Sequence, residues 1–253
     1  MTARAFVLLS GGIDSSVCLA LACLQFKQKV VGVSVDYGQR HKKEMDYARM
    51  QCVDHGIDHV VLPISTIPRT MLTDPGAEIP KISYADIKGV SPTYVPFRNG
   101  LLLATLTSYV AGQFDLEDKK DNADLNAELQ ARGASSHVTV SNAEEWGIYF
   151  GAHAEDAQNW AYPDCCFEWT GAMAAAIYIG TYHRVRLHVP LQWMNKKCIV
   201  DLGHELGVDF SKTWSCYAGG EKHCGVCPTC QARRAGFVEA GISDPTEYEQ
   251  AAA

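Results

Sequence analysis

The chain contains 253 residues with a net charge of −7, and 47% of the residues are hydrophobic while 20% are charged. This composition is typical of a globular protein that buries a sizeable core, and it favours one α/β domain with an appended module. The acidic balance argues against a broad nucleic-acid-binding face, and no stretch approaches the roughly 18 apolar residues of a membrane span. Because no export signal is recognisable, the ten cysteines are expected to be reduced thiols of a cytoplasmic protein.

The first predicted elements flank a glycine turn. Residues 5–9 form a short apolar run typical of a buried strand, and residues 15–22 have the composition of a helix. The turn between them contains Ser-Gly-Gly-Ile-Asp-Ser, from Ser10 to Ser15. Such a turn directs backbone N–H groups and a helix N-terminus toward an anion, and its glycines let a phosphate approach the main chain. We therefore predict a phosphate-binding loop; an N-capped turn without a ligand is the alternative.

The pattern that follows predicts an α/β fold with a doubly wound parallel sheet. Strands at 30–37 and 59–64 enclose a helix over 42–55, which completes a βαβαβ half. Further strands are predicted at 146–151 and 185–189, and further helices at 100–111, 167–179 and 196–206. The glycine turn and the segment from Asp36 to Gln39 both follow strand ends, where parallel sheets bind ligands.

Two segments interrupt this alternation. Residues 68–92 are rich in proline and are predicted to form a loop that covers the sheet edge. Residues 115–145 are polar and charged, and they are predicted to be an insertion, either a solvated helix or a partly disordered arm. The domain that contains the glycine turn is expected to span residues 1–212, followed by a C-terminal module and tail over 213–253.

Four cysteines define the C-terminal module. Cys216, Cys224, Cys227 and Cys230 form two overlapping Cys-x-x-Cys units with an additional upstream thiol. Four thiolates at such spacing can enclose one tetrahedral Zn²⁺ without an open position, which predicts a structural zinc site. An iron–sulfur cluster is an alternative because the ligands alone do not fix the metal; a thioredoxin-like redox pair is disfavoured by the four cysteines. His223 is expected to be a solvated neighbour rather than a ligand.

Another pair of cysteines, Cys165 and Cys166, lies in a polar loop expected to face the ligand site. A catalytic thiol at this position remains an alternative, although no paired base is visible in the sequence.

Several stretches together resemble one enzyme family. The glycine turn resembles the PP-loop of N-type ATP pyrophosphatases, which cleave ATP between its α and β phosphates. Further matching stretches are Asp-Tyr-Gly-Gln-Arg-His at 36–41, Val-Pro-x-Arg-Asn at 95–99, Tyr-Pro-Asp-Cys at 162–165 and Thr-Trp-Ser-Cys-Tyr at 213–217. With the four cysteines, they resemble the QueC family of 7-cyano-7-deazaguanine (preQ0) synthases, over nearly the whole chain except about 115–145. The resemblance implies an adenine nucleotide α-hydrolase-like fold.

The resemblance also implies a reaction. The substrates would be 7-carboxy-7-deazaguanine, ammonia and ATP with Mg²⁺, and the carboxylate would be adenylated and converted to an amide. A second ATP would then activate the amide oxygen, and loss of AMP would give the nitrile. The implied partners are these small molecules, with no nucleic acid and no membrane, and the protein is expected to be a homodimer.

The predicted site residues fall into three groups. Catalytic roles are assigned to Asp14 as a candidate for positioning Mg²⁺, to Lys196 for neutralising phosphate charge, and to Arg98 as a partner for carboxylate or phosphate. An ordinary exposed lysine is the alternative for Lys196. The predicted ATP-binding residues are Leu9, Ser10, Gly11, Gly12, Ile13, Asp14, Ser15, Ser16, Asp36 and Tyr37. The predicted residues for the other substrate are Gln39, Arg40, Arg98, Asn99, Tyr162, Asp164 and Glu168.

The sequence departs from the family pattern in the loop that contains Cys165 and Cys166. Cys166 stands where the family usually has an arginine, and Glu168 is followed by Trp169 rather than phenylalanine. A ligase that stops at the 7-amido product, or uses another amine, is therefore an alternative. A nucleotide-binding interaction module and a tRNA-modifying ligase are further alternatives, which the intact PP-loop and the acidic balance respectively disfavour.

Overall fold

The computed structural model describes residues 4–40, 42–65, 67, 69–132 and 145–249. Five parallel strands form one sheet in the order β3-β2-β1-β4-β5. They are β1 (Ala5–Leu8), β2 (Val30–Asp36), β3 (Asp58–Pro63), β4 (Trp146–Tyr149) and β5 (Val185–His188). The predicted parallel α/β architecture is confirmed.

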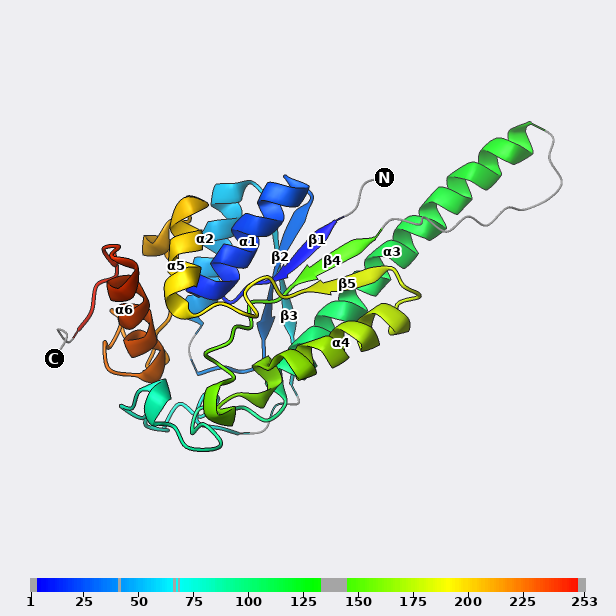
Figure 1. Cartoon of the computed structure of the whole chain (residues 1–253). Helices are drawn as coiled ribbons and strands as arrows, with labels where there is room; N and C mark the ends of the chain where they lie inside the picture. Colours follow the sequence, from blue (N-terminus) through cyan, green and yellow to red (C-terminus); the bar gives the residue numbers. More distant parts are fainter. Residues whose placement is uncertain (1–3, 41, 66, 68, 133–144, 250–253) are drawn as a thin grey trace.

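The helices cover both faces of this sheet (Figure 1). One core contains apolar residues of α1 (Ile13–Phe26), α2 (Lys43–His55), α5 (Lys196–Glu205) and α6 (Pro228–Ala240). The other core contains residues of α3 (Arg98–Ala131) and α4 (Phe167–Gly180). The described residues also form four 3₁₀ turns: η1 (Tyr84–Asp86), η2 (Gln158–Trp160), η3 (Pro163–Cys165) and η4 (Phe210–Lys212).

Strand β1 lies in the centre of the sheet and is buried because its residues, Ala-Phe-Val-Leu, are all apolar. Ala5 pairs with Val30 of β2 on one side and with Gly147 of β4 on the other. The chain leaves β1 toward α1 on one face and leaves β4 toward α4 on the opposite face. The β1–β4 boundary is therefore the topological switch point, where sheets of this type bind ligands beyond the strand ends.

Helix α3 is much longer than predicted. It begins at Arg98 and ends at Ala131, and it runs through the first half of the segment predicted as a polar insertion. No glycine or proline occurs between Phe114 and Ala131, and the Ala, Leu, Glu, Gln and Lys residues there favour a helix. The outer end of α3 extends beyond the sheet (Figure 1). The second half of the insertion, residues 133–144, lies outside the described residues.

Other differences from the sequence prediction concern β4 and α6. Strand β4 ends at Tyr149 instead of residue 151: the Phe150 N–H still donates to the His188 carbonyl of β5 at 2.9 Å, but Gly151 packs against Asp14 and Ser15 of the glycine turn. Helix α6, which contains Cys230, was not predicted at all. None of the described helices is both long and apolar enough to cross a membrane.

Candidate active site

The glycine turn connects β1 to α1, and its first glycine is required by packing. Gly11 has a φ of +81°, and a Cβ built on it would lie 2.2 Å from the backbone oxygen of Glu44 and 2.9 Å from the backbone nitrogen of Ala48. The backbone of α2 therefore occupies the space that any side chain here would need. The carbonyl of Gly11 also accepts a hydrogen bond from the Trp214 N–H at 2.8 Å.

The hydroxyl groups of the turn differ in their availability. Ser10 and Ser15 lie 3.1 Å apart at their Oγ atoms and line a cavity. The Ser16 hydroxyl is buried, 2.7 Å from the Gly12 carbonyl and 2.8 Å from Oε1 of Gln51. The Ser15 hydroxyl also donates to the Gly12 carbonyl, at 3.1 Å, but of these three residues only Ser10 and Ser15 line the cavity, so the turn presents these two to a ligand.

The carboxylate of Asp14 faces a buried lysine from the other end of the chain. Lys196 Nζ donates to Asp14 Oδ1 at 2.6 Å and lies 3.0 Å from Nε2 of His153. Burial alone would raise the pKa of Asp14, but the charge of Lys196 holds it below its ordinary value. Burial would lower the pKa of Lys196, yet Asp14 raises it. The alternative of an ordinary exposed lysine is therefore wrong.

His153 was not predicted as part of this cluster. It follows β4 in the chain, is 2% exposed, and lies 3.3 Å from Oδ2 of Asp156 through Nε2. Its Nδ1 is buried and has no hydrogen-bond partner among the described residues. Sequence spacing offered no signal for this residue, because only the sheet brings the end of β4 beside α1 and α5.

A cavity of about 220 Å³ lies beyond the carboxyl ends of β1, β2 and β4. Nine predicted site residues line it: Leu9, Ser10, Asp14, Ser15, Tyr37, Gln39, Arg40, Arg98 and Asn99. Gly151 lies on its wall, where a Cβ would come within 3.3 Å of Asp14 and Ser15. The PP-loop residues and the residues predicted for a second substrate therefore share one chamber.

The other predicted residues described next do not line this cavity. Gly12 is the N-cap of α1, and Ile13 is buried in the core behind the turn. Asp36 pairs with Lys42 at 2.5 Å, which together with the Gly38 N–H lowers its pKa. The Tyr162 hydroxyl is buried against the hydroxyls of Ser91 and Thr93. Glu168 is exposed in the first turn of α4.

Arg98 is the first residue of α3 and carries the positive charge of the chamber. Its guanidinium lies 5.9 Å from the ring centre of Tyr37. Burial would lower the pKa of Arg98, but two neighbouring tyrosines, first Tyr37, and the carboxyl of Asp164 raise it above its ordinary value. The guanidinium is therefore charged at every accessible pH and can bind an anionic substrate group.

Asp164 lies behind Asn99. The Asn99 N–H donates to Asp164 Oδ2 at 3.2 Å, and burial raises the pKa of this carboxyl despite the opposing charge of Arg98. Its Oδ1 is buried without a hydrogen-bond partner among the described residues. A buried acceptor without a hydrogen-bond partner lowers the stability of the protein unless a ligand or a water molecule donates to it.

Arg40 has a role that the sequence did not indicate. Its Nη1 donates to the carbonyl of Ala77 at 2.6 Å and its Nη2 to the carbonyl of Pro75 at 3.2 Å. The side chain thus fastens the proline-rich loop beside the cavity, whose wall includes Leu72 of the same loop. Its predicted contact with substrate stays a prediction.

Glu44, in the first turn of α2, is a cavity residue that sequence reasoning missed. Burial raises the pKa of its carboxyl to about 7, although Arg98 and a hydrogen bond from Gln39 Nε2 at 3.3 Å oppose the shift. The sequence signal that could have placed Glu44 near the ligand site was its position three residues after the 36–41 motif, at the start of a predicted helix.

Cys165 lines the cavity, but its thiol is not activated. Burial raises the pKa of Cys165 well above its ordinary value, and the nearby carboxyls of Asp156 and Asp164 add to this shift. A thiol must ionise to act as a nucleophile, so the catalytic-thiol alternative is disfavoured. Cys166 is the N-cap of α4.

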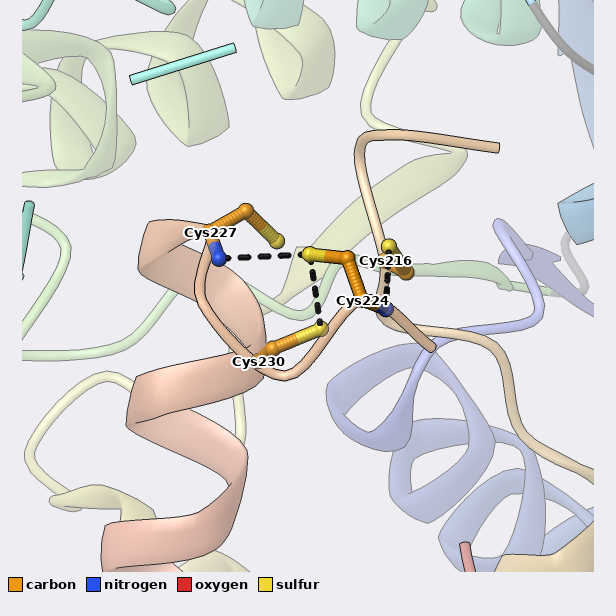
Figure 2. Close-up of side chains that lie close together, drawn as sticks. All are labelled: Cys216, Cys224, Cys227 and Cys230. Atoms are coloured by element: carbon orange, nitrogen blue, oxygen red, sulfur yellow. Dashed lines mark hydrogen bonds between the residues drawn. The ribbon is translucent and has the colours of Figure 1, made fainter. Parts of the chain in front are cut away.

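The four predicted metal ligands converge (Figure 2). The sulfur atoms of Cys216, Cys224, Cys227 and Cys230 all lie within 4.8 Å of one another. Backbone N–H groups point at two of them: those of Ala218 and Cys224 at Cys216 Sγ, both at 3.3 Å, and that of Cys227 at Cys224 Sγ, also at 3.3 Å. Convergent thiols supported by N–H donors fit a closed tetrahedral metal site.

His223 is buried rather than solvated, which corrects the sequence prediction. It is 4% exposed, its Nε2 accepts a hydrogen bond from the Ser215 N–H at 3.0 Å, and its ring packs on Trp214. Burial lowers the pKa of His223 to about 4, so the ring is neutral. The same module contributes Tyr217 to the cavity wall, another contact that spacing could not predict.

The chain is similar to proteins of known name along nearly its whole length. The family model described as "Queuosine biosynthesis protein QueC" matches residues 4–118 and 133–241. The 7-cyano-7-deazaguanine synthase of Thermoplasma acidophilum is 37% identical over 98% of this chain and 92% of its own length. The enzyme of that name from Caldicellulosiruptor bescii is 35% identical over 97% of each chain.

A solved structure, of NMN synthetase from Francisella tularensis, aligns with 96% of this chain and 79% of its own at 14% identity, with a TM-score of 0.37. The residues between the two segments that the family model matches, 119–132, belong almost entirely to the outer end of α3.

Proposed function

The chain is an enzyme of the QueC family of 7-cyano-7-deazaguanine synthases, and we propose that it converts 7-carboxy-7-deazaguanine, ammonia and ATP into the nitrile by two successive adenylations. In the first, the substrate carboxylate attacks the α-phosphorus of ATP and pyrophosphate leaves. Ammonia then displaces AMP to give the amide. In the second, the amide oxygen attacks another ATP, and loss of AMP forms the nitrile.

The glycine turn is suited to the phosphates of ATP. Ser10 and Ser15 present hydroxyls to the cavity, beside the N-terminus of α1. The helix N-terminus stabilises the charge that develops on the departing pyrophosphate. We infer that Lys196 neutralises phosphate charge and that Asp14 orients the lysine, since the two are joined at 2.6 Å. Asp14 is also the candidate to hold Mg²⁺, which would neutralise negative charge on the phosphates.

The opposite wall is suited to an acidic guanine-like substrate. Arg98 offers a permanently charged guanidinium for its carboxylate. Asp164 lies behind the lining residue Asn99; its buried Oδ1 lacks a partner among the described residues, and we infer that it accepts from the N–H groups of the guanine-like edge. We favour Asp164 over Glu168 for this role because Glu168 is exposed.

We infer three further properties from the resemblance and the composition. The four-cysteine cluster holds a structural Zn²⁺, because closed sites of four thiolates are typical of zinc. The protein is a cytoplasmic homodimer that acts on small molecules, in keeping with ten free cysteines and an acidic net charge. The C-terminal module over 213–253 is a separate unit that follows the domain over 1–212, and its Tyr217 lines the cavity.

The observation that carries the proposal is the single chamber that contains Ser10, Ser15 and Asp14 together with Arg98. The experiment is mass spectrometry of the products from 7-carboxy-7-deazaguanine, Mg·ATP and ammonium, with AMP and pyrophosphate quantified. We expect the nitrile with two AMP per product. Amide with one AMP would replace the proposal by the amide-forming alternative, and consumption of neither substrate would refute the substrate assignment. Asp14→Asn serves as the inactive control.

A further inference from the structure

Glu44 is a carboxyl of the cavity that the steps above leave without a role. It projects from the first turn of α2, whose backbone packs directly against Gly11 of the PP-loop. Its side chain lines the same chamber as Ser10, Asp14 and Arg98. Gln39 Nε2 donates to its Oε1 at 3.3 Å and fixes the orientation of the carboxyl.

The proposed reaction needs a proton acceptor in this chamber. Ammonium carries no free electron pair, so it must lose a proton before its nitrogen can form the C–N bond. As that bond forms, the C–O bond to AMP breaks with its electron pair on AMP, and another N–H proton leaves. Adenylation of the amide oxygen and the final loss of AMP each remove one more proton from nitrogen. The first adenylation, by contrast, releases none.

The acidic and basic groups considered next already have ionic partners, assigned substrate contacts or a permanent positive charge, so they are poor proton acceptors. Asp14 is paired with Lys196 at 2.6 Å, and Asp156 lies 3.3 Å from His153. Asp164, behind Asn99, accepts its N–H at 3.2 Å through Oδ2, and its Oδ1 is assigned above to the guanine-like edge of the substrate. Lys196 and Arg98 are cations, whose pKa values lie above their ordinary range.

We propose that Glu44 is the general base of the steps that follow the first adenylation, accepting N–H protons at its carboxylate and returning them to solvent. This role rests on the proposed function. The pKa of Glu44 supports this geometry. Burial raises it to about 7, and a general base is most efficient when its pKa lies near the working pH. The groups that face it are Arg98 from α3, Tyr37 after β2 and Gln39; Asp14, Arg40, Asp156 and Tyr217 line the same chamber from the remaining elements.

The test uses the Glu44→Gln variant and measures the first adenylation and the later steps separately. Adenylation is measured as ATP–pyrophosphate exchange that depends on 7-carboxy-7-deazaguanine, and the later steps as amide and nitrile formed in a single turnover with ammonium. We expect exchange to stay within about threefold of wild type while amide formation falls by about 10²–10⁴, the usual contribution of a general base. Asp46→Asn is the matched control, because it removes an acidic charge from the same turn of α2 on its exposed side.

The outcomes are distinct. Equal losses of exchange and amide formation would overturn the proposal, since they would show a binding or structural role; unchanged amide formation would overturn it as well. If Glu44→Gln does not fold, the wild-type pH profile decides. The rate with ammonia, corrected for the fraction of free NH₃, must rise with pH through about 7, while exchange must not. A wild-type enzyme that releases no pyrophosphate with this substrate would instead refute the proposed function.

Discussion

Replacing Gly11 by alanine tests whether the PP-loop glycine is needed for packing against α2. The added Cβ would lie 2.2 Å from the Glu44 carbonyl oxygen and 2.9 Å from the Ala48 nitrogen, and both are backbone atoms that cannot rotate away. The φ of +81° adds conformational strain. The strain costs about 1–2 kcal/mol, and the overpacking about 1–3 kcal/mol more. We expect Gly11→Ala to lower the free energy of unfolding by their sum, about 2–5 kcal/mol.

Gly56→Ala is the matched control at the other end of α2. Gly56 has a φ of +64°, but a Cβ there would meet nothing within 4 Å, so its substitution costs only the strain, about 1–2 kcal/mol. The assay is urea unfolding of both variants and wild type, supported by thermal unfolding, where each kcal/mol shifts the midpoint by about 2–4 °C. Equal destabilisation of the two variants would refute the packing argument.

Three further predictions concern the buried charge pair and the cysteines. Lys196→Met removes the cation that faces Asp14, and we expect ATP–pyrophosphate exchange to fall by about 10²-fold, whereas Lys197→Met, at a half-exposed position, leaves it unchanged. Cys216→Ser breaks the four-thiol cluster, and we expect elemental analysis to show loss of one zinc per chain together with a lower unfolding temperature. Because the pKa of Asp14 is lowered by Lys196, its stabilisation is present above the ordinary value of 3.8 and is lost as the pH falls below it. Acid unfolding of Asp14→Asn should therefore depend less on pH in that range than unfolding of wild type; identical profiles would contradict the inferred shift.

The strands and several helices could be predicted from the sequence because their signals are local. The apolar run before Ser10 and the glycines after it determine a strand and a turn, whatever the rest of the chain does. The spacing of the cysteines likewise placed four thiols within one short segment, and the structure brings their sulfur atoms within 4.8 Å of one another. For residues 115–145 the sequence left a solvated helix and a partly disordered arm as alternatives; the structure has a helix through Ala131, continuous with the helix predicted over 100–111, which the polar composition alone did not indicate.

The composition of the candidate site was decided by the tertiary structure. Asp14 and Lys196 are 182 residues apart in the chain, and only the packing of α5 beside α1 joins them at 2.6 Å. Glu44 belongs to the cavity because α2 packs on Gly11, and His223 is buried because its ring packs on Trp214 within the C-terminal module. Sequence patterns report the preferences of neighbouring residues, whereas burial, charge pairing and pKa depend on groups that the fold brings together from distant segments. The sequence by itself therefore determined the sheet, the glycine turn and the thiol spacing, and only the tertiary structure decided which side chains meet in the chamber.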